Sequence, residues 1–166
     1  MPKPISFTQA DGLLAAADQM PFLDELKEEP DNSLRVVILG AVVEDAAAAG
    51  DPCGNPVLDQ ILAQCSPILP DAFRKVEIFF GDYILYQVRN ESYCSFDERE
   101  ERTGKYLVQY QKSQLLDYLL IATDACRLED GSCYPGAWKH YGICTQNHIV
   151  DVIAQAEPDV LLWGEG

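Results

Sequence analysis

One segment constrains the fold more than any other. Residues 34–44, LRVVILGAVVE, form an almost unbroken aliphatic run rich in valine. Such a run is typical of a buried strand, because β-branched side chains pack well on a pleated surface. A buried strand needs paired neighbours and a covered face, so the chain must build a sheet with a second layer against it.

A second β segment covers residues 75–88, KVEIFFGDYILYQV, where two apolar runs flank Gly81 and Asp82. A glycine at the first central position suits a type II′ turn, so the spacing predicts a hairpin. In that hairpin Phe80 would face Tyr83, and both faces would be apolar. We expect it inside a sheet covered on two sides, or with one face left for a partner.

A final hairpin is expected from HYGICT and HIVDVI, residues 140–153, with its turn at Gln146 and Asn147. A two-residue turn places His140 opposite Ile153 and His148 opposite Thr145. The apolar VLLW at 160–163 is then a last strand or a packed terminus.

Helices are predicted at 55–66, where Pro56 follows the capping residue Asn55, and at 113–126, where Ser113 caps an apolar stripe. Residues 1–33 are expected to form a helical N-terminal segment packed on a single domain, 1–166. The resulting fold class is α+β, with a mainly antiparallel sheet of about five to seven strands flanked by two to four helices.

The net charge is −15, from 27 acidic and 12 basic residues. A field of that sign repels phosphate backbones and attracts a basic protein, so we expect a basic partner and no direct nucleic-acid binding. Acidity that serves only solubility, or that reflects a salty host cytoplasm, accounts for the same number.

Several kinds of site are not indicated. The six cysteines lack zinc spacing, and neither a dinucleotide fingerprint nor a phosphate loop occurs, so we expect no metal and no cofactor. There is no basic-then-apolar leader and no apolar run of membrane-spanning length. The expectation is a cytoplasmic protein with reduced thiols and no membrane contact.

The final hairpin carries the one catalytic alternative. In the predicted register His140, Cys144 and Asp151 project from one face, as a base, a nucleophile and an orienting carboxylate would. A strand in a very acidic chain is a poor setting for a thiolate. His140 and His148 project from opposite faces, so they cannot share one metal ion. A small enzyme or metal-binding protein using these residues stays as an alternative.

Two polar loops, 90–105 and 127–138, combine aromatic and acidic side chains, which are the usual ingredients of a protein-binding surface. Aromatics that tuck back into the core would give the same sequence. The expected anchors are Tyr93, Phe96, Tyr134 and Trp138, and the carboxylates expected to pair with Lys or Arg are Asp97, Glu98, Glu100 and Glu101.

The stretches ILYQVRNESYCSFDE (84–98) and HYGICTQNHIVDVIAQAEP (140–158) resemble a signature of small, mostly uncharacterised bacterial proteins. More loosely, they resemble acidic immunity proteins that neutralise toxins. The resemblance covers roughly the C-terminal half of the chain. It implies a non-enzymatic inhibitor that binds a toxin or effector protein, in particular a basic nuclease. Phage-type inhibitors of nucleic-acid-binding proteins look alike at this level, and a homodimer is compatible with the apolar hairpin.

Overall fold

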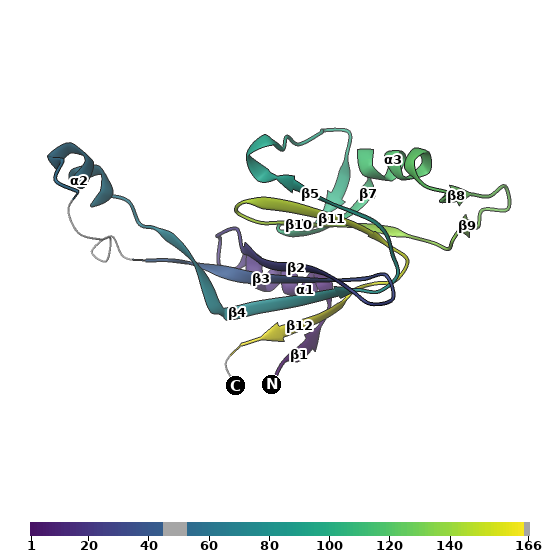
Figure 1. The fold of residues 1–166 in the computed structure, drawn as a ribbon, viewed down its shortest axis with the longest axis horizontal. Helices are drawn as coiled ribbons and strands as arrows, with labels where there is room; N and C mark the ends of the chain where they lie inside the picture. The colour runs from purple at the N-terminus through teal and green to yellow at the C-terminus, as the bar shows by residue number, and fades with distance from the viewer. Residues whose placement is uncertain (45–52, 165–166) are drawn as a thin grey trace.

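The computed structural model describes residues 1–44 and 53–164, which build two five-stranded antiparallel sheets stacked face to face (Figure 1). Sheet A has the strand order β1 (Lys3–Ile5), β12 (Asp159–Trp163), β4 (Ile68–Phe80), β3 (Ser33–Val43) and β2 (Phe22–Glu29). Sheet B has the order β5 (Tyr83–Asn90), β11 (His148–Ala154), β10 (Lys139–Cys144), β7 (Leu107–Lys112) and β6 (Glu101–Thr103).

Within the described residues, three α-helices accompany the sheets: α1 (Phe7–Ala15), α2 (Pro56–Leu62) and α3 (Gln114–Ala122). A short 3₁₀ helix, η2 (Glu91–Tyr93), follows β5, and a small hairpin of β8 (Cys126–Arg127) and β9 (Cys133–Tyr134) follows α3. None of the helices within 1–44 and 53–164 is long and apolar enough to cross a membrane. The predicted α+β class with mainly antiparallel sheet is confirmed.

The main core lies between the two sheets and includes one side of α1. Val36 and Ile38 of β3 and Ile78 of β4 meet Tyr141 and Val152 of sheet B, and all five side chains are fully buried. Phe7 of α1 packs edge-on against Tyr141, with 5.1 Å between ring centroids. The run at 34–44 is therefore the buried strand that its composition indicates, at least over its first half.

The N-terminal 33 residues differ from the expected helical segment. Only Phe7–Ala15 is helical, with Ser6 and Gln9 forming a reciprocal capping box, and residues 22–29 are strand β2. Pro21 ends the helical pattern. Leu23 and Leu26 both pack against the core cluster, because an irregularity between Leu23 and Glu25 shifts the alternation by one residue. Residues 22–29 form a strand and not a helix because their backbone groups pair with the edge of β3.

The hairpin predicted across Gly81 and Asp82 does not form. Both strands exist, but β4 pairs with β3 and β12 while β5 pairs with β11, so the turn crosses from one sheet to the other. Phe80 lies opposite Leu34 and not opposite Tyr83. Asp82 has the positive φ of 50°, so the glycine at 81 does not mark a type II′ turn.

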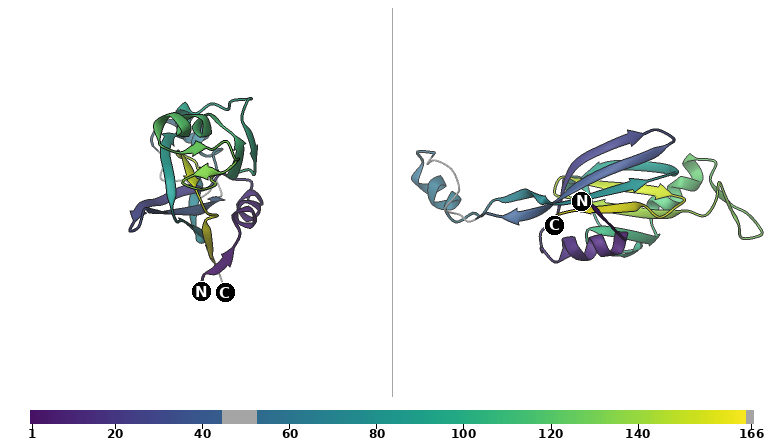
Figure 2. Two further views of the ribbon diagram at one scale, coloured as in Figure 1. Left: turned by 90° about the vertical axis from the view of Figure 1, so that its right-hand side faces the viewer. Right: turned by 90° about the horizontal axis from the view of Figure 1, so that it is seen from below.

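The final hairpin is confirmed in detail. β10 and β11 pair with His140 opposite Ile153 and Gly142 opposite Asp151, and Thr145 and His148 close the turn. The VLLW segment is confirmed as a strand, β12, which joins β1 and β4. Because β1 and β12 pair, the two ends of the chain lie side by side (Figure 2).

β3 and β4 extend well past the rest of sheet A and carry α2 at their far end (Figures 1 and 2). We call this extension the arm: residues 40–43, residues 68–71 and α2. Asn55 caps α2 as predicted, by accepting hydrogen bonds from the backbone of Val57 and Leu58. The helix does not flank a sheet, however, and none of its residues is buried. The stripe that predicted a core helix instead faces solvent.

Candidate functional site

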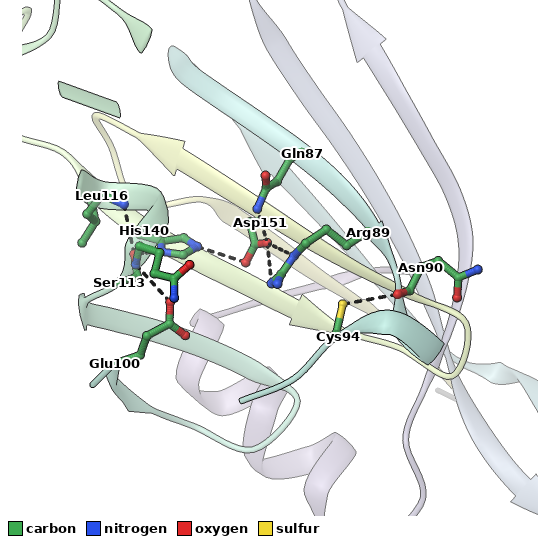
Figure 3. A network of polar contacts seen from close by, with 10 residues as sticks. Gln87, Arg89, Asn90, Cys94, Glu100, Ser113, Leu116, His140 and Asp151 are labelled. Atoms are coloured by element: carbon green, nitrogen blue, oxygen red, sulfur yellow. Dashed lines mark hydrogen bonds and ion pairs between the residues drawn. The ribbon is translucent and has the colours of Figure 1, made fainter. Parts of the chain in front are cut away.

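The outer face of sheet B carries a network of polar side chains, drawn in Figure 3. α3 and the loop at 90–105, called here the acidic loop, cover this face. The side chains come from three neighbouring strands: Gln87 and Arg89 from β5, Asp151 from β11 and His140 from β10. Strand alternation sends the neighbours of these residues, such as Tyr141 and Val152, into the main core.

Asp151 is the centre of the network, although only 1% of the residue is exposed. One carboxylate oxygen accepts from His140 Nε2 at 3.1 Å, and the other accepts from Gln87 Nε2 at 3.0 Å and from Arg89 Nε at 3.1 Å. Burial alone would raise the pKa of Asp151. The hydrogen bonds from His140 and Gln87 and the charge of Arg89 outweigh burial, so the pKa lies below its usual range.

Both ring nitrogens of His140 form hydrogen bonds, and one face of the ring stacks on an aromatic side chain. Ser113 Oγ lies 2.8 Å from Nδ1, and the ring of Tyr110 stacks on the imidazole at 4.2 Å between centroids. Ser113 also caps α3, because its oxygen accepts the backbone N–H of Leu116 at 3.1 Å. The hydroxyl proton is therefore free to donate to Nδ1, which leaves Nε2–H to donate to Asp151.

Ser113, His140 and Asp151 thus form a hydrogen-bonded chain, but its geometry is that of a support. Ser113 is 2% exposed and has extended backbone angles, φ −157° and ψ 158°, without the strain of a nucleophile elbow. Its oxygen is already engaged at the helix cap. These hydrogen bonds join the start of α3 to sheet B and fix the orientation of the imidazole.

Gly142 makes room for this arrangement. A Cβ at residue 142 would lie 2.7 Å from a methyl of Val108 and 2.9 Å from the ring of Tyr110. Gly142 is also the residue directly opposite Asp151 in the β10–β11 pair. Any larger residue would push Tyr110 off the imidazole.

Two cavities of about 400 Å³ each open beside the network. They adjoin, because both are lined by Arg89, Glu100 and Gln114. The first cavity also reaches His140 and Asp151, and it is completed by Gln87, Tyr110, Leu115 and Tyr118. The second runs under the acidic loop and is completed by Asn90, Tyr93, Cys94, Ser95 and Asp97.

The carboxylates of the acidic loop fall into two groups. Asp97 binds Arg99 and the Gln114 side chain, and these hydrogen bonds, with Arg99 as the main cause, hold its pKa well below the usual range. Glu100 accepts the backbone N–H of Gln114 at 3.1 Å. Both residues therefore anchor the loop to the start of α3. Glu98 and Glu101 are exposed and form no ion pair within the described part of the chain.

The four predicted aromatic anchors are not on one surface. Tyr93 is 89% and Phe96 is 77% exposed, and the guanidinium of Arg102 lies 4.3 Å from the Phe96 ring centroid. Tyr134 is exposed too, but it belongs to the β8–β9 hairpin, on the other side of α3 from the acidic loop (Figure 1). Trp138 is half-buried against the cluster that contains Leu115 and Leu119.

The catalytic alternative of His140, Cys144 and Asp151 is only partly assembled. The three residues do share one face of the hairpin, and His140 contacts Asp151. Cys144 is buried against Val108 and lines neither cavity. Burial raises the pKa of its thiol to about 11, which disfavours the thiolate. In the described residues no three His, Cys, Asp or Glu side chains gather closely enough to hold a metal ion.

The sequence patterns do not predict several residues of the site: Gln87, Arg89, Tyr110, Gln114 and Tyr118. One signal was present, because Gln87 and Arg89 alternate with Tyr86 and Val88, which marks a strand with one polar face. The assumed pairing of residues 75–88 hid that face.

Comparison of the chain with protein-family models, with curated proteins and with solved structures finds no match in any of the three.

Proposed function

We propose that this protein is a non-enzymatic inhibitor that binds a basic toxin or effector protein through the acidic loop and the cavities beside it. The exposure of Tyr93 and Phe96, 89% and 77%, carries the proposal. Aromatic side chains held in solvent gain little within the fold, whereas buried aromatic anchors dominate the binding energy of protein interfaces. Glu98 and Glu101 stand free on the same loop.

The charges that line the two cavities favour a cationic guest. Asp151 is paired with Arg89 and Asp97 with Arg99, which leaves Glu100 as the lining carboxylate that has no ion pair in the described part of the chain. A Lys or Arg side chain from a partner would find Glu100 together with the ring of Tyr118, a combination that suits both ionic and cation–π contact. The remaining charge of the chain, −15 in total, steers such a partner toward the surface.

The surface is also held in place before any partner arrives. Asp97 and Glu100 bind the loop to Gln114, and Ser113 and His140 bind the start of α3 to sheet B. A preorganised surface loses less conformational entropy on binding, which leaves more of the contact energy for affinity. These residues act as supports for the anchors and not as anchors themselves.

A basic nuclease is the preferred class of partner, because an acidic surface competes directly with phosphates for a cationic groove. A phage-type inhibitor of a nucleic-acid-binding protein would use the same surface for the same reason. The identity of the captured protein separates these two readings.

The proposal is tested by affinity capture from the native host with the wild-type protein and with the double variant Tyr93→Ala/Phe96→Ala. The matched control is Ile121→Ala, which removes an 83% exposed apolar side chain from α3. We expect a basic protein that wild type and control retain and the double variant loses. Its association rate, measured with purified protein, should fall at least tenfold between low and high NaCl.

Two results would overturn the proposal. One is the capture of no protein that depends on Tyr93 and Phe96. The other is an association rate that ignores salt, since the carboxylates would then contribute nothing to the encounter.

A second candidate function is a small-molecule site in the cavity at His140, and the buried His140–Asp151 pair on its wall favours it. The variant His140→Asn separates the two functions. Capture and salt dependence that survive this substitution would speak against a role for the imidazole beyond support. Loss of a bound metabolite, seen by mass spectrometry of native protein, would speak for it.

A further inference from the structure

We propose that the arm is a dimerisation element, in which α2 of one copy seats in an apolar cavity at the root of the arm of a second copy, and the reverse contact forms at the same time. This inference does not depend on the proposed function, because the arm and the acidic loop belong to different sheets and different charge environments.

Beyond Gly40 and Ala41, which are buried, the described part of the arm is uncovered. β2 pairs with β3 only as far as Leu39, and β12 pairs with β4 only as far as Lys75, so from Gly40 outward the two strands pair with each other alone. α2 buries no residue. The large apolar side chains exposed on the arm and at its root are Val42, Val43, Val57, Leu58, Ile61, Leu62, Ile68, Leu69 and Phe73.

The extent of this apolar surface is that of an interface. From their exposed fractions, these nine residues present roughly 700–800 Å², and one partner contributes about 800 Å² to a stable protein–protein interface. Scattered apolar residues on a surface need no explanation, but nine large ones gathered on one projecting element and its root mark a contact site. A two-stranded ribbon alone is also marginally stable in water, so the arm gains from being covered.

A receiving surface exists on the same chain. A cavity of about 420 Å³ lies between α1, the root of the arm and β12. Its lining is mainly apolar, with Leu13, Leu14, Phe73, Val76, Leu162 and Trp163, and it also includes Asp71 and Arg74. α2 lies at the opposite end of the arm from this cavity (Figures 1 and 2), so a chain cannot fill its own cavity. A second copy related by a two-fold axis fills both cavities through one repeated contact, the commonest form of homodimer.

The low charge of α2 and of the cavity wall favours contact between two copies of this acidic chain. Two chains of net charge −15 repel each other except where their surfaces carry few acidic groups. α2 has a single charged residue, Asp59. The two charged residues that line the cavity, Asp71 and Arg74, form an ion pair with each other at 2.7 Å, so the cavity wall adds no net negative charge. A contact between α2 and the cavity therefore brings few like charges together.

The test is sedimentation velocity over a wide concentration series. Ile61→Glu places a charge on the seated face of α2, and Leu13→Glu places one on the cavity wall. Both side chains are about half exposed, so neither substitution disturbs the core. The control is Ile121→Glu, an exposed isoleucine on α3, far from the arm. We expect a wild-type dimer, a dissociation constant raised at least about 100-fold by each arm variant, and no change in the control.

Mixing the variants sharpens the result. Ile61→Glu keeps an intact cavity and Leu13→Glu keeps an intact α2, so an equimolar mixture should regain one of the two contacts and dimerise more tightly than either variant alone. The dimer should also hold or tighten as NaCl rises, because salt screens the repulsion between the copies.

A wild-type protein that stays monomeric overturns the inference, as does a dimer that Ile61→Glu leaves intact. A monomer whose arm binds neutral lipid vesicles, or a foreign protein captured through Ile61, would assign the arm another occupant and equally refute a second copy.

Discussion

At the scale of single residues, buried carboxylates hold distant parts of the chain together. Asp11 of α1 accepts three backbone N–H groups at the start of β7: Lys105 at 2.9 Å, and Tyr106 and Leu107 at 2.8 Å each. Asp11→Ala leaves these donors without a partner, and we expect the free energy of unfolding to fall by about 3 kcal/mol or more. Urea denaturation measures the loss. The exposed Asp24→Ala should stay within about 0.5 kcal/mol of wild type, and an equal effect of both would refute the role of Asp11.

Asp151 makes a prediction about pH. Its pKa is lower in the folded protein than in the unfolded chain, so its stabilising effect is present above the unfolded pKa and is lost as the pH falls through the folded pKa. Asp151→Asn leaves Arg89 without its ion pair, and at pH 7 it should cost about 3 kcal/mol of unfolding free energy. The gap to wild type should shrink as the pH falls below the unfolded pKa of about 4, because the unfolded wild-type chain then takes up a proton that the folded protein does not. A gap that stays constant from pH 7 to pH 3 would contradict this account.

At the scale of elements, we expect α2, the outer part of the arm, to be separable from the two-sheet body. Val43 and Ile68 lie directly opposite each other, so an Asn-Gly turn can replace residues 44–67. Because α2 buries no residue, the shortened protein should unfold within about 1 kcal/mol of wild type at low protein concentration. Thermal and urea denaturation measure the difference. A loss of several kcal/mol would show that the arm belongs to the cooperative fold.

Some elements of the fold can be predicted from their own local sequence, and others depend on tertiary pairing. The β10–β11 hairpin follows from its own alternation and a two-residue turn, so its register is predictable to the residue. The turn at Gly81 and Asp82 has the same local pattern, yet it joins two sheets, because β4 finds its partners in β3 and β12. Only tertiary pairing distinguishes these outcomes. The helix at residues 56–62 likewise has the stripe of a core helix and no core to join.

Some contacts of the candidate site also follow from local sequence, and others depend on tertiary pairing. His140 and Asp151 belong to one hairpin, and alternation places them on a common face. Ser113 is recognisable as a helix cap, but its bond to His140 spans 27 residues, and the bond between Arg89 and Asp151 spans 62. Such contacts depend on the strand order of sheet B, which no local pattern contains.

At the scale of the whole molecule, charge sets the response to salt. With 27 acidic and 12 basic residues, the folded chain holds its carboxylates closer together than the unfolded chain does. Screening this repulsion should raise the melting temperature by roughly 3–8 °C between low and moderate NaCl, equivalent to about 1–2 kcal/mol. An uncharged solute of equal osmolality is the control. The same salt series should tighten association between copies and weaken association with a basic partner, because the first brings like charges together and the second brings opposite charges together. A melting temperature that is flat or falls with NaCl would mean that local pairs such as Arg35 with Glu77 outweigh the net repulsion, and both salt predictions for association would then lose their basis.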